Sequence, residues 1–524
     1  MSRVFEFLEV AKSYFLENWY SSKTLYGALF VYGVYKVVYH TFFDQLRDVP
    51  GDWISKFTAY KFRSATFSGE TTRYLQGLHK KYGPVVRIGP NKVSDAKTSD
   101  FKKVMASYRF SKSASYDGFA LVDPSIFSTR EENFNRERRR QIGPAFSQAG
   151  LDSVENLLES ICIDSSIKKL DQITDDGNGS GYINYFKHFQ NVTADVIGEL
   201  AFGNSFNATE NGGHEITDWV NETMKVSELF SSFPILRKFR YVLPGFTTKD
   251  SNLRQFCIES IKKRRDLIKS GKFDQNRIDI LQMVLSAENS KTKQPLNSNE
   301  LVAEMVTMLI AGIDTTSISM SWLVAFIMLY PKVHKKVVDE IRTNFPRKED
   351  RITYKEAKEK LPYFIATVYE VLRIRGSVGF ALSRQVPKSG VHLSGYDIPQ
   401  GTDVLMFIAG AHEDTQVWEN PKAFIPERFL GPNAESLKKD IVAFSSGIRV
   451  CPGKNLAWME ISMTVGNILK DFDISFPPDS KLGPKVLDPE RNNEPKLPAD
   501  ITFGTRPPEF PERDCNIIIT KHIF

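Results

Sequence analysis

The spacing of apolar and polar residues predicts a chain built mostly from helices. Residues 301–330 are apolar for nearly their whole length and would form a helix of roughly 45 Å, so we expect this helix to cross the interior. From about Gln141 onward the apolar spacing is mostly helical. Strand-like alternation is confined to short pieces such as Val85–Ile88 and Val391–Ile398. This pattern predicts a mainly α (α+β) fold in which residues 44–524 form one large helical domain with small β-sheets.

An apolar stretch near the N-terminus, Leu25–Phe43, has about the length that a bilayer core requires. No small-residue cleavage site follows it, which favours an uncleaved transmembrane signal anchor, with residues 1–24 lumenal. Lys36 would cost about 3 kcal/mol in mid-span, so an amphipathic helix lying on the membrane is the alternative. A slight basic excess in residues 44–63 favours a cytosolic body. The following Val49-Pro50-Gly51 predicts a joint about which the body can swing.

Composition excludes several other classes of protein. The net charge of +6 is small for 524 residues, and no dense basic tract interleaves with aromatic residues, which argues against nucleic-acid binding. The four cysteines are scattered, so neither a CxxC zinc site nor a disulfide framework is expected. A reducing compartment is the simpler interpretation. We therefore expect the four N-glycosylation sequons, at Asn178, Asn191, Asn207 and Asn221, to be unused.

The segment Phe444–Gly453 carries the strongest chemical signal. Gly447 and Gly453 bracket Cys451 and let the backbone bring N–H groups close to the sulfur. A helix is predicted from Lys454, and its start should favour the negatively charged thiolate. Taken alone, a structural cysteine in a glycine turn explains the pattern as well. A phosphate-binding Walker loop is excluded, because the spacing of the glycines and the residue after Lys454 are both wrong.

This segment resembles the FxxGxRxCxG signature of the cytochrome P-450 family at every fixed position. The resemblance extends over about residues 49–522. Within the family, the sequence resembles filamentous-fungal microsomal members of secondary metabolism. It implies that haem b is the cofactor and that Cys451 is the axial ligand to its iron, a thiolate that favours cleavage of the O–O bond. It further implies that Arg449 binds a haem propionate, and that Phe444 and Gly453 shape the surroundings of the sulfur.

A second motif, residues 311–316, stands on the long apolar helix and resembles the oxygen-activation motif of the family. Breaking dioxygen requires protons in a pocket that otherwise excludes water. Thr315 would supply a hydroxyl beside the iron, Asp314 would relay protons, and Gly312 would loosen the helix to admit dioxygen. In isolation, threonines that bond back to helix carbonyls would explain the pattern better.

Glu370 and Arg373 fall on one face of a predicted helix, a spacing typical of an ordinary ion pair. Together with Arg428 in Pro426–Phe429 they resemble the family's Glu-Arg-Arg network. This network would hold the loop that leads to Cys451 and would do no chemistry. Because burying an ion pair rarely adds net stability, conformational specificity is the better reason for it.

Further residues are assigned by the resemblance alone. Arg139 matches the arginine of a propionate-binding motif, in which Asn135 stands where the family usually has Trp or His. Arg384 lies where another propionate partner is often found. The candidate substrate-binding residues, each equally well explained as core packing, are Phe119, Leu121, Ile310, Val378 and Phe380.

The resemblance implies a monooxygenase that inserts one oxygen atom from dioxygen into an apolar small molecule, on the cytosolic face of the endoplasmic reticulum membrane. Electrons would come from NADPH through a diflavin reductase. A reductase-docking surface is predicted around the cysteine loop, with a solvated basic face as the alternative; its residues are Arg136, Arg140, Lys438, Lys439 and Lys454. Two other functions stay open: a haem-thiolate isomerase or dehydratase that does not use dioxygen, and a non-catalytic membrane haem sensor.

Overall fold

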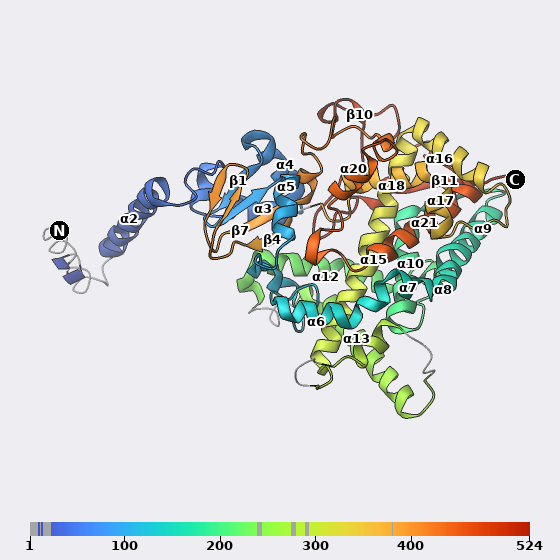
Figure 1. Cartoon of the computed structure of the whole chain (residues 1–524), viewed down its shortest axis with the longest axis horizontal. Coiled ribbons are helices and arrows are strands. Elements are labelled where there is room, and N and C mark those ends of the chain that lie inside the picture. Colours follow the sequence, from blue (N-terminus) through green and yellow to red (C-terminus); the bar gives the residue numbers. More distant parts are fainter. Residues whose placement is uncertain are drawn as a thin grey trace.

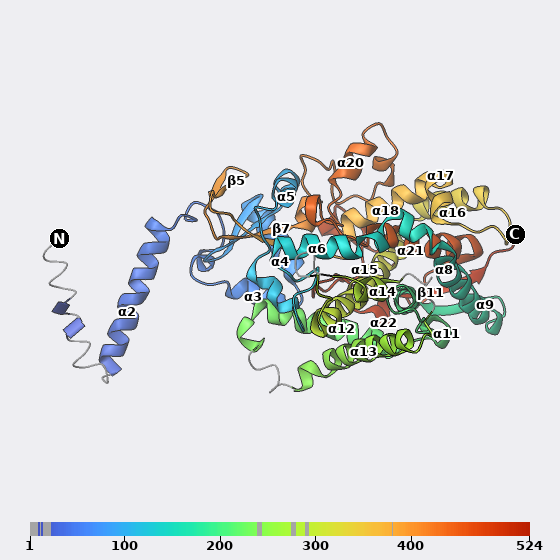
Figure 2. The same ribbon diagram turned by 60° about the horizontal axis from the view of Figure 1, so that its bottom comes forward.

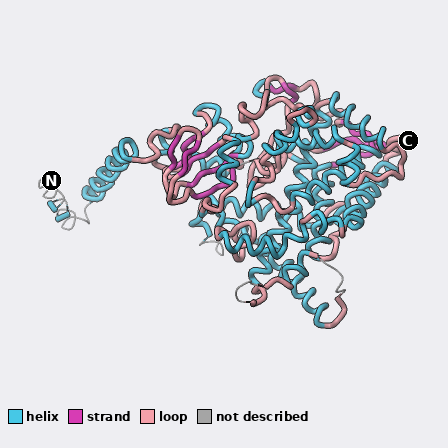
Figure 3. The backbone as a smooth tube through the Cα atoms, in the orientation of Figure 1, coloured by secondary structure: helices cyan, strands magenta, loops and turns pink. Residues whose placement is uncertain are grey.

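A computed structural model of the chain describes residues 9–10, 12–13, 22–237, 244–273, 279–288, 293–379 and 381–524. Helices dominate these residues, and the strands are short and gathered in small groups (Figure 3). The fold is therefore mainly α with small sheets, which confirms the predicted class.

The α-helices of the described residues are spread over the whole length of the chain. In chain order they are α2 (Ser22–Val38), α3 (Tyr60–Phe67), α4 (Thr71–Tyr82), α5 (Thr98–Met105), α6 (Glu132–Ile142), α7 (Gln148–Asp152), α8 (Glu155–Glu159), α9 (Ser166–Asp176), α10 (Tyr185–Ile197), α11 (Ala208–Asn211), α12 (Glu215–Ser232), α13 (Pro244–Lys269), α14 (Ile280–Leu285), α15 (Ser298–Leu329), α16 (Pro331–Asn344), α17 (Tyr354–Lys360), α18 (Pro362–Arg375), α19 (Ile408–Ala411), α20 (Ala434–Asp440), α21 (Lys454–Asp471) and α22 (Pro511–Asp514).

The predicted central helix is α15, which begins three residues earlier than the apolar run. A capping box explains the difference: the Asn297 side chain accepts from the Glu300 N–H, and Glu300 accepts from the Asn297 N–H, both at 2.9 Å. The helix ends at Leu329, and Pro331 opens α16.

The largest sheet has four strands in the order β1-β2-β7-β4, and it lies beside α3, α4 and α5 (Figure 1). Its strands are β1 (Val85–Gly89), β2 (Lys92–Asp95), β7 (Asp403–Phe407) and β4 (Ala381–Gln385). A three-stranded sheet, β3-β11-β8, lies near the C-terminus, and two pairs of strands complete the set. These remaining strands are β3 (Ser180–Asn184), β11 (Asn516–Lys521), β8 (Phe472–Ser475), β5 (Val391–Leu393), β6 (Tyr396–Ile398), β9 (Leu487–Asp488) and β10 (Glu494–Pro495).

The predicted strand Val85–Ile88 corresponds to β1, but Val391–Ile398 is a hairpin and not one strand. Its two halves, β5 and β6, pair antiparallel. The chain reverses at Ser394 and Gly395, whose φ values of 43° and 93° lie in the left-handed region. Apolar alternation on both sides of this turn made the two strands look continuous in the sequence.

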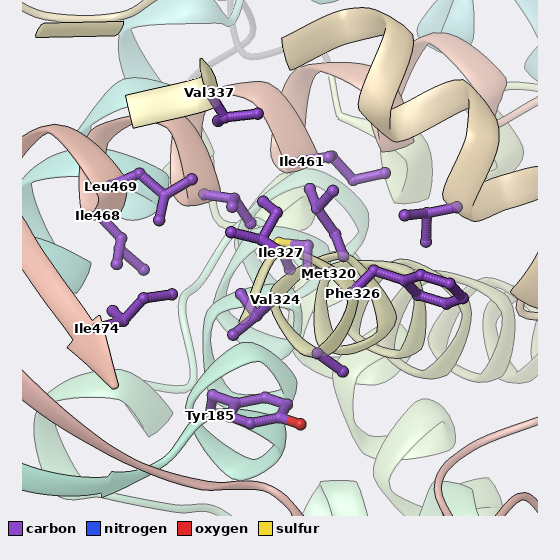
Figure 4. Packing of buried hydrophobic residues seen from close by; sticks show 14 of the residues in the cluster. Tyr185, Met320, Val324, Phe326, Ile327, Val337, Ile461, Ile468, Leu469 and Ile474 are labelled. Carbon is purple, nitrogen blue, oxygen red and sulfur yellow. The ribbon is translucent and has the colours of Figure 1, made fainter. Parts of the chain in front are cut away.

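The main hydrophobic core surrounds the second half of α15. In Figure 4 its side chains meet residues from α10, α16, α21 and β8. The labelled residues are Tyr185, Met320, Val324, Phe326, Ile327, Val337, Ile461, Ile468, Leu469 and Ile474. Among the described residues α15 is also the helix long and apolar enough to cross a membrane, but it lies mostly buried inside the domain. Its apolar character is therefore that of a core helix.

The N-terminal apolar stretch forms α2 and a following π-helical turn, η1 (Tyr39–Phe43). Helix α2 stands outside the body of the protein in both views (Figures 1 and 2). Its apolar side chains are not packed: Tyr26 and Phe30 are 70% and 73% exposed. An apolar helix whose side chains lie exposed among the described residues has the surface expected of a lipid-facing segment.

The junction between this helix and the body differs from the expected joint. Asp44 accepts hydrogen bonds from His40 at 2.5 Å and from the buried Arg87 of β1 at 2.6 Å. Val49 is buried, and a Cβ on Gly51 would lie 2.4 Å from the Arg87 carbonyl oxygen. The segment is thus docked on β1, so the prediction of a free swing at Val49-Pro50-Gly51 is wrong.

Candidate active site around Cys451

The Cys451 loop turns tightly between Phe444 and helix α21. The Cys451 N–H donates to the Phe444 carbonyl at 2.9 Å, which closes the loop on itself. Gly447 has a φ of 63°, and a Cβ there would lie 2.4 Å from the Met105 carbonyl oxygen. Only glycine fits this position without strain. At Gly453 a Cβ would lie 3.9 Å from the Cys451 sulfur, an ordinary contact, so packing in this structure does not require glycine there.

Cys451 is the accessible cysteine of the chain. Cys162, Cys257 and Cys515 are buried, whereas Cys451 is exposed. Burial by the surrounding protein nevertheless raises the pKa of the Cys451 thiol, against the lowering effects of the Gly453 N–H, Arg139 and Lys454. The residue is thus exposed although protein surrounds its thiol. The Gly453 N–H, at the start of α21, favours the thiolate as expected, but burial has the larger effect on this pKa.

Basic side chains converge near this loop. Arg449 pairs with Glu132 at 2.7 Å, but its Nη1 is buried without a hydrogen-bond partner. Arg139 donates to the Val450 carbonyl at 2.7 Å, which fixes α6 against the residue before the cysteine. Arg384, on β4, donates to its neighbour's carbonyl and to the Tyr116 hydroxyl.

A fourth cation near the loop, Lys112, was not predicted from the sequence. Its Nζ donates to the Phe127 carbonyl and lies 4.2 Å from the centre of the Tyr116 ring. Burial, followed by repulsion from Arg384 and other basic groups of this cluster, holds the pKa of Lys112 well below its usual range. No motif marks Lys112, because it reaches the cluster only through the pairing of residue 112 with β4.

The side chain of Asn135, which stands where the family usually has Trp or His, is engaged within the protein. Its amide donates to the Ile126 carbonyl at 2.7 Å, and its carbonyl oxygen accepts from the Arg139 Nε at 3.1 Å. Because both ends of this buried amide are engaged, Asn135 orients Arg139 and ties α6 to the segment before it.

The predicted oxygen-activation residues lie on α15. The Thr315 hydroxyl donates to the Ala311 carbonyl at 2.7 Å, the back-bonding arrangement that was the alternative. Unlike a core threonine, however, Thr315 lines a cavity. Asp314 is buried and accepts a hydrogen bond from the Thr505 hydroxyl, and burial raises the pKa of Asp314 to about 6. A carboxyl with such a pKa can both give and take a proton near neutral pH.

Gly312 has a different role from the one expected. Helix α15 runs unbroken from Ser298 to Leu329, so Gly312 does not loosen it. A Cβ on Gly312 would lie 2.7 Å from Ile197 Cδ1. The glycine therefore lets α10 pack closely against α15.

A cavity of about 400 Å³ adjoins Thr315, and its walls are mostly apolar. Four of the predicted substrate-binding residues line it: Phe119, Leu121, Ile310 and Val378. The fifth, Phe380, lies outside the described residues. Thr505 also lines the cavity, so the residue that holds Asp314 belongs to its wall. The volume is in the range of pockets for small molecules.

The predicted ionic network forms beneath the cysteine loop. Arg373 donates to both oxygens of Glu370 at 2.7 and 2.8 Å, and Arg428 donates to the same carboxylate at 3.2 Å. Arg373 also donates to the His412 carbonyl, and the His412 ring accepts from the Val442 N–H at 2.9 Å. The network is thereby linked to the start of the cysteine loop through His412, a residue that no motif identified.

Comparison with known proteins decides the family. The model of the family described as Cytochrome P450 matches residues 53–497. The chain belongs to the cytochrome P450 family. Cytochrome P450 monooxygenase helB1 of Aspergillus fumigatus is 31% identical to it, over 93% of this chain and 84% of the relative. Cytochrome P450 monooxygenase FUS8 of Gibberella fujikuroi is 28% identical, over 83% of this chain and 84% of the relative. The trichothecene C-4 hydroxylase of Trichoderma arundinaceum is 29% identical, over 85% of this chain and 90% of the relative.

Cytochrome P450 enzymes are oxidoreductases of the monooxygenase class, and the family implies a haem whose iron is bound by a thiolate. The residues present fit that group. Three buried basic groups, Lys112, Arg384 and Arg449, and the half-buried Arg139 lie near one carboxylate, Glu132, and Arg449 keeps an unpartnered buried N–H. Buried positive charge in such excess is stabilised by a nearby anion, and the two propionates of a haem are anions of this kind. The accessible sulfur of Cys451 supplies the thiolate.

Proposed function

We propose that this cytochrome P450 binds haem b through Cys451 and inserts one oxygen atom from dioxygen into an apolar small molecule. The observation that carries the proposal is the arrangement of an accessible, glycine-flanked cysteine beside an unbalanced cluster of buried cations. When bound, the haem supplies the activation of dioxygen. The fungal relatives support a substrate from secondary metabolism.

The residues of the chain around the cavity would then deliver protons and exclude water. Thr315 places a hydroxyl at the cavity wall, and the apolar lining keeps bulk water out. Behind it, Asp314 can pass protons toward that hydroxyl, held in place by Thr505. This pair favours a monooxygenase over an isomerase or dehydratase, because a reaction without dioxygen needs no such relay.

Thr315→Ala is expected to leave haem and substrate binding intact and to lower product formed per NADPH by about tenfold or more, since positioned proton transfer contributes 10²–10⁴-fold. The electrons would appear as peroxide. Thr307→Ala is the matched control, because Thr307 lines the same cavity and donates to the carbonyl four residues back in the same way. Unchanged product per NADPH in Thr315→Ala, or an equal loss in Thr307→Ala, would contradict the role of Thr315.

We further propose that a diflavin reductase delivers the electrons from NADPH to the face of α6. Arg136 and Arg140 are exposed on this helix, on either side of Arg139, which reaches the residue before Cys451. Lys439 and Lys454 are exposed as well, whereas Lys438 is partly neutralised by Glu435 at 2.7 Å. An acidic flavin domain would be steered toward such a surface, mainly through its association rate.

Reversing Arg136 and Arg140 to glutamate is expected to slow reductase-supported turnover by about tenfold at low salt and to flatten its dependence on ionic strength. Turnover driven by peroxide should not change, because it needs no reductase. The control reverses Lys262 and Lys263, which are exposed on α13. An equal loss in both assays would show damage to α6, and no loss in either would reject this docking surface.

Finally, we propose that the chain is held at the endoplasmic reticulum membrane by the helix within residues 25–43, with the body in the cytosol. The exposed apolar side chains of α2 support this. Trp53, Tyr60 and Phe67, which follow in the chain, are likewise at least 65% exposed. They extend the apolar surface from the helix onto the adjoining part of the body.

A further inference from the structure

One wall of the cavity holds a buried carboxyl that the proposed reaction does not use. Glu228 lies on α12, is 7% exposed and lines the cavity. Its Oε2 is buried and has no hydrogen-bond partner among the described residues. A buried polar group without a partner is costly, and a carboxyl more so than a hydroxyl, which makes this oxygen a candidate contact for a ligand.

The electrostatic surroundings of Glu228 leave it without a counter-charge. Burial alone raises the pKa of Glu228 to about 7, with no contribution from a neighbouring charged group. Other polar groups of the same wall are occupied: Ser227 donates to the Thr223 carbonyl at 2.8 Å and Thr307 to the Ala303 carbonyl at 2.8 Å. Ser383 Oγ, on β4, also lacks a partner, but it is a single hydroxyl. Among the carboxyls that line the cavity, Asp123 and Asp403 are half-buried, so Glu228 is the buried one, and its Oε2 is an acceptor without a partner.

Helix α12 packs closely against two other segments near Glu228. One turn earlier on α12, Met224 approaches Gly504 so closely that a Cβ there would lie 2.2 Å from Met224 Cε. Gly504 adjoins Thr505, the partner of Asp314. On the other side, a Cβ on Gly118 would lie 2.2 Å from the Ser231 backbone nitrogen. The close approach of Gly118 to the Ser231 backbone holds α12 in place three residues from Glu228, and a rigid element is what an anchor for a substrate requires.

We infer that Glu228 anchors the substrate by accepting a hydrogen bond from a hydroxyl or protonated amine on an otherwise apolar molecule. The anchored end lies on the α12 wall, so the carbon presented to Thr315 is a different part of the same molecule. This inference rests on the proposed function, because it takes the cavity to be the substrate pocket. It adds a chemical class: an apolar skeleton with one hydrogen-bond donor remote from the oxidised position.

The test measures binding to the full-length, haem-loaded protein by calorimetry, without turnover. The probes share one apolar ring and differ in one group: cyclododecanol, cyclododecylamine and cyclododecane. Glu228→Leu removes the acceptor, and Glu228→Gln keeps a hydrogen-bonding group but loses the charge. Ser227→Ala is the neighbouring control, because its hydroxyl is already bonded within α12. Haem content and the thermal unfolding midpoint establish that each variant is folded.

Glu228→Leu is expected to weaken binding of at least one donor probe by about tenfold, while cyclododecane binds as before. If the donor is a hydroxyl, Glu228→Gln retains cyclododecanol; if it is an ammonium, both variants lose cyclododecylamine. The inference is overturned if Glu228→Leu binds all three probes like the wild type, or loses all three equally. Because no turnover is measured, either failure would leave the monooxygenase proposal standing on its Thr315 test.

Discussion

Replacing Arg373 by alanine is expected to yield little or no haem-loaded protein. Arg373 and Glu370 are both fully buried, so the substitution would leave Glu370 with a charge that Arg428 alone must balance. Three backbone carbonyls, those of residues 412, 421 and 423, would also lose their donor. Breaking one side of a buried ion pair costs about 3–5 kcal/mol, a large share of the roughly 5–15 kcal/mol by which domains are stable.

The Arg373→Ala substitution should also displace the cysteine loop. Arg373 holds the His412 backbone, and His412 accepts from the Val442 N–H two residues before Phe444. Haem per chain and the midpoint of thermal unfolding are the measurements. Lys336→Ala is the control, because its ion pair with Glu427 is exposed and should contribute at most about 1 kcal/mol. Normal haem content with an unchanged midpoint in Arg373→Ala would contradict the supporting role of this network.

The second large effect is expected for Cys451→Ala, which should remove thiolate-ligated haem and all turnover. The other three cysteines are buried, and burial raises the pKa of each above its ordinary value. None of them can therefore replace the lost ligand. Cys257→Ala removes a buried thiol elsewhere in the chain and should keep haem and activity, which makes it the matched control.

Residues with local signatures were predictable from the sequence. The glycines around Cys451 and the three-residue spacing of Glu370 and Arg373 are set by local backbone geometry, so a motif can carry them. The core helix was predicted from its apolar run, and its true start could have been found from the Asn-x-x-Glu pattern at Asn297. The hairpin in residues 391–398 was missed because alternation alone does not show a turn.

Residues that reach the site through long-range contacts were not predictable. Thr505 meets Asp314 across 191 residues of sequence, and Lys112 joins the cation cluster only because its segment pairs with Arg384 of β4. His412 and Glu228 stand in no motif either. The opposing effect of burial on the Cys451 thiol was not predictable for a related reason: the pKa depends on how much protein surrounds the sulfur, and that is a property of the whole fold.

The central claim is that Cys451 binds the haem iron as a thiolate, and the spectrum of the reduced, carbon monoxide-bound protein tests it most directly. The intact chain is predicted to show the long-wavelength Soret band of a thiolate-ligated haem. Cys451→Ala should lack this band, whereas Cys257→Ala should keep it. A Cys451→Ala protein that retains the thiolate band, or an intact, haem-loaded chain that never shows it, would contradict the assignment.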